Sequence, residues 1–257
     1  MRELFIIAAG KGSRLGGNIP KALVPISGVP NLTLTLQKIG RKFDHVFVVT
    51  NSMMCDEWDA YQLETMKNFP ELINTDTTHF ITIGSGLGDG HAVLRALQER
   101  DSYRERGDDI TICWGDTFFQ NANIVDELLS KKFQNGASGI VPCVREENPY
   151  VTLLVDDRMR CISADFSKYG ENHPSGFHDQ SIFRFKRTYL LTALQALHAS
   201  FWKNGRYITP GGELSLLHTF HFLYNRDNPV VVYETDYPTN SFNTTEELNL
   251  IRQQLGE

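Results

Sequence analysis

The chain has 257 residues, a formal charge of −6 and a pI of about 5.8. This length allows one large α/β domain or two small ones, and the acidic balance argues against a general nucleic-acid partner. The four cysteines form no CxxC pair, which argues against a zinc site or a disulfide framework and favours free thiols in a reducing, cytoplasmic compartment.

The first half alternates short apolar runs with amphipathic segments of helical length. The first run, Leu4–Ala9, is too short for a signal-peptide core or a membrane span, so we expect a buried strand and no membrane insertion. The predicted strands are Glu3–Ala9, Val46–Thr50, His79–Ile83 and Ile110–Cys113, and the predicted helices are Leu32–Ile39, Asp56–Phe69, Gly90–Glu99 and Ile124–Phe133. This alternation is typical of right-handed crossovers and predicts a doubly wound, mostly parallel, Rossmann-like sheet.

After Gly136 the apolar runs follow one another more closely. The predicted strands are Gly139–Val144, Val151–Val155, Cys161–Phe166, Ser181–Phe185 and Val230–Glu234, and the predicted helices are Thr188–Trp202, Gly212–Tyr224 and one that opens at a capping box formed by Thr244 and Glu247. We predict a single domain over residues 1–257, with a first lobe over 1–136 and a smaller β-rich lobe with closing helices over 137–257.

Residues 8–23, AAGKGSRLGGNIPKAL, place four glycines directly after the first predicted strand. Glycines in this position usually let backbone amides approach a phosphate. The dinucleotide fingerprint is absent because Leu15 replaces its third glycine, and the Walker A loop is absent because Asn18 and Ile19 follow the second glycine of its pattern. The cations of the segment are Lys11, Arg14 and Lys21. Three cations with these amides favour a triphosphate ligand.

The run GKGSRL followed by Pro20-Lys21 resembles the signature of nucleotidyltransferases that make nucleotide-activated sugars and alcohols. Its short spacing is similar to that of N-acetylglucosamine-1-phosphate uridylyltransferases and of small cytidylyltransferases of the isoprenoid and phosphocholine type. LGDGHA at Leu87–Ala92 resembles the turn that faces the nucleobase in this family, with Asp89 in place of threonine. The resemblance implies a GT-A-like fold, with a nucleotide-binding first lobe and an acceptor-binding second lobe.

The resemblance also implies a reaction in which a phosphate oxygen of an acceptor attacks the α-phosphorus of an NTP and pyrophosphate leaves. It implies Mg²⁺ as cofactor, held by Asp116 after the fourth strand and by Asn243 before the last helix. Arg14 and Lys21 are the implied catalytic cations, with Lys21 at the α-phosphate. The other residues implied for the nucleotide are Ala8, Ala9, Gly10, Lys11, Gly12, Ser13, Gly88 and Asp89.

On the acceptor side the resemblance is weaker. The residues implied for acceptor binding are Trp114, Tyr150, Asp165, Lys168 and Asp179. Val151 stands where the sugar enzymes have glycine beside the sugar, so we expect a small phosphorylated polyol, amino-alcohol or similar metabolite rather than N-acetylglucosamine-1-phosphate. We expect CTP slightly ahead of UTP, and a homodimer stays an open expectation.

Two rival interpretations belong to other classes. A GT-A glycosyltransferase normally carries an Asp-Xaa-Asp metal motif, which the segment Gly115–Thr117 does not provide. A non-catalytic nucleotide-sensing homologue is expected to lose the loop cations or the metal aspartate, and this chain keeps them. Both therefore rank below the nucleotidyltransferase.

Overall fold

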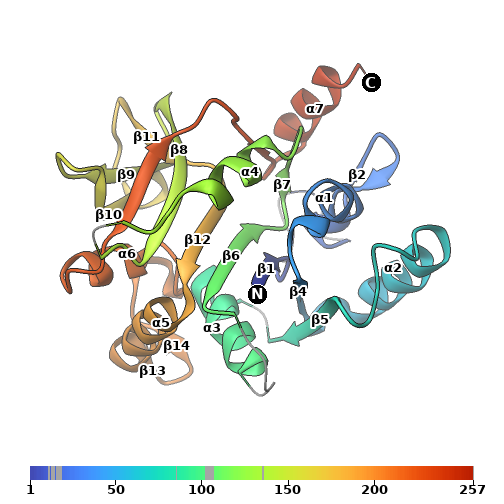
Figure 1. Ribbon diagram of the computed structural model, residues 1–257, viewed down its shortest axis with the longest axis horizontal. Coiled ribbons are helices and arrows are strands. Elements are labelled where there is room, and N and C mark those ends of the chain that lie inside the picture. The colour runs from blue at the N-terminus through green and yellow to red at the C-terminus, as the bar shows by residue number, and fades with distance from the viewer. Residues whose placement is uncertain are drawn as a thin grey trace.

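The computed structural model describes residues 1–10, 12, 15, 19–84, 86–101, 107–134 and 136–256. The strands of the main sheet are β1 (Arg2–Ile7), β4 (His45–Asn51), β5 (Thr78–Ile83), β6 (Asp109–Trp114), β8 (Gly139–Glu147), β9 (Val151–Val155), β10 (Arg160–Phe166), β11 (Ser175–Asp179), β12 (Ile182–Lys186) and β15 (Val230–Glu234). The α-helices are α1 (Asn31–Ile39), α2 (Cys55–Asn68), α3 (Asp89–Arg100), α4 (Asn123–Ser130), α5 (Arg187–Phe201), α6 (His218–Tyr224) and α7 (Thr245–Gln254). The sheet has ten strands in the order β11-β9-β10-β15-β8-β12-β6-β1-β4-β5, with helices on both faces (Figure 1).

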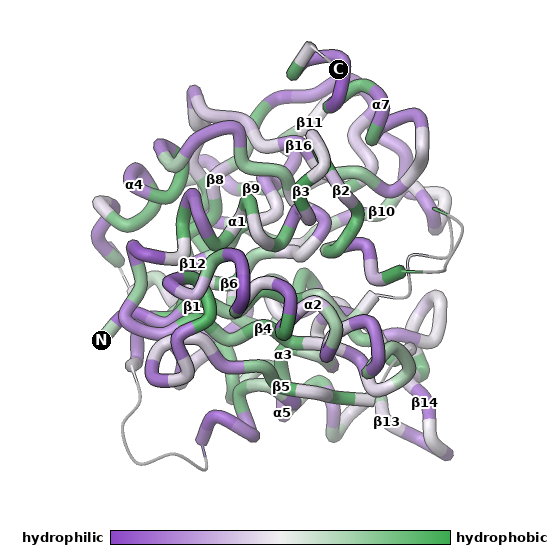
Figure 2. The backbone as a smooth tube through the Cα atoms, turned by 90° about the vertical axis from the view of Figure 1, so that its right-hand side faces the viewer, coloured by the Kyte–Doolittle hydropathy of each residue, from purple (hydrophilic) through white to green (hydrophobic). Residues whose placement is uncertain are grey.

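The first half of the chain forms the parallel part of this sheet. β1 pairs in parallel with β4 and with β6, and β4 pairs in parallel with β5. Because side chains alternate along a strand, Leu4 and Ile6 pack against α1, α2 and α4, while Phe5 and Ile7 pack with the core formed by α3, α5 and α6. The apolar strands accordingly lie inside and the hydrophilic stretches lie on the outer segments (Figure 2). The predicted doubly wound α/β fold is confirmed.

The β-rich second half extends the same sheet. β12 pairs antiparallel with β6 on one side and with β8 on the other, so it joins the parallel strands to the later ones. β15 then pairs in parallel with β8 and antiparallel with β10. The division into two lobes thus stays a proposal about function, because the backbone hydrogen bonds run across both halves.

The remaining elements are short and several of them shape the site. The two-residue strands are β2 (Pro25–Ile26), β3 (Val29–Pro30), β7 (Thr117–Phe118), β13 (Trp202–Lys203), β14 (Arg206–Tyr207) and β16 (Asn240–Ser241), and the 3₁₀ turns are η2 (Lys21–Leu23), η3 (Gly40–Lys42), η4 (Ser52–Met54), η5 (Ser167–Tyr169) and η6 (Pro210–Gly212). The predicted capping box is confirmed: the Thr244 hydroxyl accepts a hydrogen bond from the Glu247 amide, and the Glu247 carboxylate accepts one from the Thr244 amide.

One predicted helix is wrong over half its length. The helix expected over Gly212–Tyr224 begins only at His218. The segment before it is held in another conformation, because the Leu214 amide donates to the Leu87 carbonyl and the Leu214 carbonyl accepts from the Gly90 amide. These bonds lay residues 213–216 along the turn that precedes α3. β11 is a strand that the sequence analysis does not include; it begins at Ser175 and pairs with β8.

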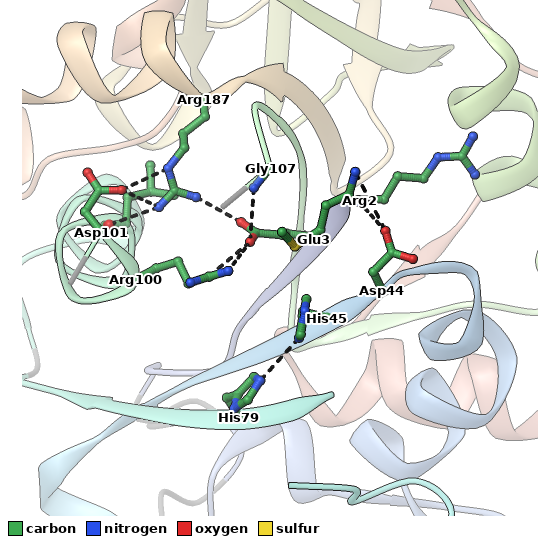
Figure 3. A network of polar contacts seen from close by, with 11 residues as sticks. Arg2, Glu3, Asp44, His45, His79, Arg100, Asp101, Gly107 and Arg187 are labelled. Carbon is green, nitrogen blue, oxygen red and sulfur yellow. Dashed lines mark hydrogen bonds and ion pairs between the residues drawn. The ribbon is translucent and has the colours of Figure 1, made fainter. Parts of the chain in front are cut away.

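A buried ionic network lies at the end of the sheet where β1 begins (Figure 3). Glu3 is fully buried, and its carboxylate lies 2.8 Å from Arg100 and 2.9 Å from Arg187. Arg187 also contacts Asp101 at 2.7 Å, and the Gly107 amide donates to Glu3. Each buried charge therefore has an opposite charge beside it, which is the condition for its tolerance inside a protein. No helix of the described residues is long and apolar enough to cross a membrane.

Candidate active site

Two adjoining cavities open where β1 and β6 end. The larger has a volume of about 590 Å³ and the smaller about 200 Å³. Six residues line both: Asp89, Trp114, Asp116, Tyr150, Glu213 and Asn243. The carboxyl ends of parallel strands are the usual place for ligands in open α/β sheets, so the position of the cavities follows from the fold.

Three side chains from distant parts of the chain meet at the junction of the cavities. The Lys21 ammonium nitrogen lies 2.8 Å from Asp116 Oδ2 and donates a hydrogen bond of 2.6 Å to Asn243 Oδ1. Lys21 begins the turn η2 after Pro20, Asp116 follows β6, and Asn243 precedes α7. The structure thus brings together three residues that the sequence analysis placed at one reaction centre.

Backbone contacts explain why Asn243 reaches Asp116. β16 pairs with β7 and sets Ser241 opposite Thr117, and the Phe242 amide donates to the Asp116 carbonyl. Glu247 then holds the Asn243 amide at the start of α7. The acidic cap thereby fixes the backbone of a residue at the junction as well as the helix.

Asn31 is a contributor that the sequence analysis missed. It is fully buried at the start of α1, and its Nδ2 donates to the carbonyls of Gly115 and Thr117, at 3.0 Å each. These two bonds hold the backbone in place on both sides of Asp116. In the sequence Asn31 looks like an ordinary helix-start residue, because its partners are more than eighty positions away.

The donor set at the junction suits an oxygen-bound cation. A carboxylate oxygen and an amide oxygen already converge on one positive nitrogen, and Mg²⁺ is typically bound through one or two carboxylates with waters and substrate phosphates completing its shell. Within the described part of the chain no group of three or more His, Cys, Asp or Glu side chains has metal-binding geometry. A resident all-protein cage is therefore not what these residues form. They fit a cation that arrives with a phosphate.

The larger cavity is lined by the glycine segment and by the turn before α3. Of the residues predicted for the nucleotide, Ala8, Ala9, Gly10, Gly12, Gly88 and Asp89 line it, whereas Lys11, Ser13 and Arg14 lie outside the described residues. Gly88 has a φ of +94°, and a Cβ there would lie 2.3 Å from the Leu214 carbonyl oxygen. A side chain at this position would push residues 213–216 away, so the turn requires glycine.

Asp89 joins this turn to the acceptor side. Its Oδ1 accepts hydrogen bonds from the Leu216 amide at 2.5 Å and from the Ser215 hydroxyl at 3.2 Å. Burial raises the pKa of the Asp89 carboxyl to about 6, although both bonds act in the opposite direction. The motif in the sequence indicates Asp89 but not the partners of Asp89, because residues 213–216 were predicted as part of a helix.

In the smaller cavity, the predicted residues Trp114, Tyr150, Lys168 and Asp179 are brought together, and Val151 also lines it. Burial raises the pKa of the Asp179 carboxyl, whose Oδ1 accepts a bond from the Ser181 amide. Ser181, Glu213 and His218 line the same space. They come from segments whose pairing with the first half only the fold reveals.

Asp165 differs from the other residues predicted for the acceptor, because it lines neither cavity. Alternation along β10 directs Phe166 into the smaller cavity, and the Asp165 carboxylate instead lies 2.8 Å from His173 Nε2. A contact between Asp165 and the acceptor is therefore not supported.

A doubly wound sheet with a glycine-rich turn after its first strand, and with polar side chains gathered at the strand ends, defines a nucleotide-binding α/β enzyme. Residues 4–198 match the family described as the MobA-like NTP transferase domain. The chain belongs to this family of NTP transferase domains.

Similar proteins extend the comparison. The chain is 27% identical over 212 residues to the bifunctional protein GlmU of Thermotoga maritima, which covers 81% of this chain and 43% of that protein. It thus spans less than half the length of this curated relative. Among solved structures, a putative glucose-1-phosphate thymidylyltransferase from Bacillus anthracis has a TM-score of 0.72 at 15% identity, covering 99% of this chain and 95% of that one. The inositol-1-phosphate CTP transferase from T. maritima has a TM-score of 0.70 at 13% identity, covering 100% and 97%. At these identities the structural likeness speaks for the fold.

Proposed function

We propose that the enzyme joins the nucleotidyl group of an NTP to a small phosphorylated acceptor and releases pyrophosphate. The observation that carries the proposal is the meeting of Lys21, Asp116 and Asn243 where a large and a small cavity adjoin. An NTP in the larger cavity and a phosphorylated acceptor in the smaller would present their reacting phosphates at this junction. The names of the relatives are consistent with this class of reaction, since one is an inositol-1-phosphate CTP transferase.

The chemistry needs positioning and charge more than proton transfer. The acceptor phosphate is already an anion at neutral pH, so no general base is required, and the transition state gathers negative charge on the oxygens around the α-phosphorus. In our proposal Lys21 turns from its carboxylate partner to these oxygens, while Arg14 and Lys11 hold the leaving β- and γ-phosphates. Asp116 and Asn243 would hold Mg²⁺, which supplies charge neutralisation between the two substrates when bound.

For the acceptor we propose a small phosphorylated polyol, amino-alcohol or sugar. The smaller cavity is lined by the Asp116, Asp179 and Glu213 carboxyls and by the Lys168 ammonium. Carboxyls suit hydroxyl or amino groups, whereas the lysine suits a phosphate. The Val151 side chain occupies space at the cavity wall, which disfavours a bulky N-acetylhexosamine phosphate. For the nucleotide we propose CTP slightly ahead of UTP.

The test is a matrix of the four NTPs against phosphocholine, glycerol-3-phosphate, inositol-1-phosphate, glucose-1-phosphate and N-acetylglucosamine-1-phosphate, read by release of pyrophosphate. We expect release to need Mg²⁺ and to be fastest with CTP and one of the smaller acceptors. A kcat/KM for UTP with N-acetylglucosamine-1-phosphate above all other pairs would overturn the acceptor proposal. Release of free nucleotide from a nucleotide sugar, without pyrophosphate from any NTP, would instead identify a glycosyltransferase.

A further inference from the structure

A cluster of four rings adjoins the larger cavity and has no part in the chemistry proposed above. The Asn204-Gly205 turn, with φ of +51° and +79°, closes the hairpin of β13 and β14 and sets Trp202 opposite Tyr207. The Trp202 ring lies over the rings of His91 and His198, with centroids 6.0 Å and 5.3 Å away. This packing fixes the planes of both imidazoles.

The Tyr207 hydroxyl bridges the two imidazoles. Its oxygen lies 2.7 Å from His91 Nδ1 and 2.8 Å from His198 Nδ1, and Tyr207 is only 1% exposed. A phenol has one proton to donate. While both imidazoles are neutral, the hydroxyl therefore donates to one Nδ1 and accepts from the other, because two accepted bonds would leave its own proton without a partner among the described groups.

This arrangement determines what His91 presents on its other side. When Tyr207 donates to His91 Nδ1, the His91 proton is on Nε2, which is then a donor. When Tyr207 donates to His198, His91 keeps its proton on Nδ1 and Nε2 becomes an acceptor. Burial lowers the pKa of His91 to about 4 and raises that of Tyr207 to about 12, so both stay neutral near pH 7.

His91 lines the larger cavity and is absent from the lining of the smaller one. It lies in the first turn of α3, two residues after Asp89, and the cavity wall beside it is formed by the segment after β5. β5 is separated from β6, the strand that Asp116 follows, by three strand spacings, or about 14 Å. A nucleotide whose α-phosphate lies at Asp116 would extend into the larger cavity, and we place its base against the wall formed by His91 and the segment after β5.

We propose that His91 reads the polar edge of the nucleobase through Nε2, and that Tyr207 and His198 select whether Nε2 donates or accepts. This inference rests on the proposed function for the placement of the nucleotide. It makes His91 a specificity-determining residue that touches the base, and it makes Tyr207 and His198 positioning residues. Cytosine has a donor at position 4 and an acceptor at N3, whereas uracil has an acceptor at position 4 and a donor at N3. Each of the two proton arrangements of His91 therefore suits a different base at a given atom.

The experiment is titration calorimetry of CTP, UTP, ATP and GTP with Mg²⁺ and no acceptor. The variants are His91→Phe, His91→Gln and His198→Phe, with His221→Phe, an exposed histidine of α6, as the matched control. For His91→Phe we expect about a tenfold rise in Kd for the preferred nucleotide, the value of one hydrogen bond. Thermal unfolding checks that each variant is folded, and His91→Gln takes the place of His91→Phe if the latter is not.

His198→Phe separates base reading from a structural role. Without His198 the Tyr207 proton has only His91 as acceptor, so Nε2 becomes a fixed donor. We expect the ratio of the CTP and UTP Kd values to change at least about fivefold, toward UTP if Nε2 meets the exocyclic group and toward CTP if it meets N3. A purely structural histidine would weaken both nucleotides alike.

Two results would overturn the inference: Kd values within twofold of the wild type for all four nucleotides in the folded His91 variants, or an unchanged CTP to UTP ratio in His198→Phe. Failure of the proposed function looks different. A wild-type protein that binds no NTP, or binds one and releases no pyrophosphate with any acceptor, counts against the reaction whatever the variants do.

Discussion

Replacing Asp89 by asparagine is expected to make the nucleotide-free protein more stable at neutral pH. The Asp89 carboxyl has a folded-state pKa of about 6 against an ordinary value of 3.8, because burial penalises its charge. Asparagine is close in size and keeps an oxygen for the Leu216 amide and the Ser215 hydroxyl. The substitution thus removes the buried charge while retaining its hydrogen-bond partners.

The magnitude follows from the pKa difference. Below the unfolded-state pKa both states carry the proton, and the folded state bears no penalty. As the pH rises from the unfolded-state pKa through the folded-state pKa, the unfolded chain gains the free energy of ionisation before the buried carboxyl can, so stability is lost. A difference of about two pH units corresponds to about 3 kcal/mol at about pH 8, and about 2 kcal/mol of this develops between about pH 4.5 and pH 8.

The assay is urea denaturation of wild type and Asp89→Asn across that pH range. In the difference between the two free energies of unfolding, the titration of every group that both proteins share cancels. We expect this difference to grow in favour of Asp89→Asn as the pH rises, whereas Asp59→Asn, an exposed change on α2, should show a flat difference. A flat difference for Asp89→Asn would refute the reasoning, since it would mean that Asp89 titrates normally in the fold.

Four further expectations concern the junction and the buried network. Asp116→Ala should abolish pyrophosphate release while leaving the melting temperature nearly unchanged, and Mg²⁺-dependent turnover in this variant would remove the metal assignment. Asn243→Ala should only raise the Mg²⁺ concentration needed for turnover, because a neutral oxygen binds the ion less strongly. Lys21→Ala should lower kcat by about 10²–10³-fold, the usual loss for one donor to transition-state charge, and steady-state kinetics showing a raised KM alone would make Lys21 a ground-state binder. Glu3→Gln should lower the free energy of unfolding by about 3–5 kcal/mol, because it removes the carboxylate that lies between two buried guanidinium groups. Urea denaturation tests this against the exposed Glu71→Gln, which should change little.

Local pattern predicted most of the fold. Val230–Glu234 was predicted with the bounds of β15, because a short apolar run between polar turns indicates a buried strand. The strands and helices of the first half were found within a few residues for the same reason. Residues 212–217 were mistaken for helix because Leu214, Leu216 and Leu217 have helical spacing, whereas their conformation is set by bonds to the distant turn at Leu87.

The site could be predicted only where a motif carries it. Lys21, Asp116 and Asn243 were identified from short patterns, and the structure brings them within hydrogen-bond distance. Asp165 was placed by spacing alone, and spacing does not reveal which face of β10 a residue occupies. The Asn204-Gly205 dipeptide is a strong hairpin signal that was overlooked, because the preceding helix pattern extends to Trp202.

The position of β12 limits how this enzyme can adapt to its ligands. Its register with β6 joins Ile182 to Cys113 and continues to Lys186 and Asp109, and its other edge bonds β8. Two halves joined by such a ladder cannot swing apart on a hinge without breaking its hydrogen bonds. Closure around a substrate is therefore expected in exposed segments at the cavities, such as the one that carries Tyr150. The same separation makes the segment of Tyr150 a natural target for engineering, because it can be exchanged to admit a different acceptor while the strand that precedes Asp116 remains intact.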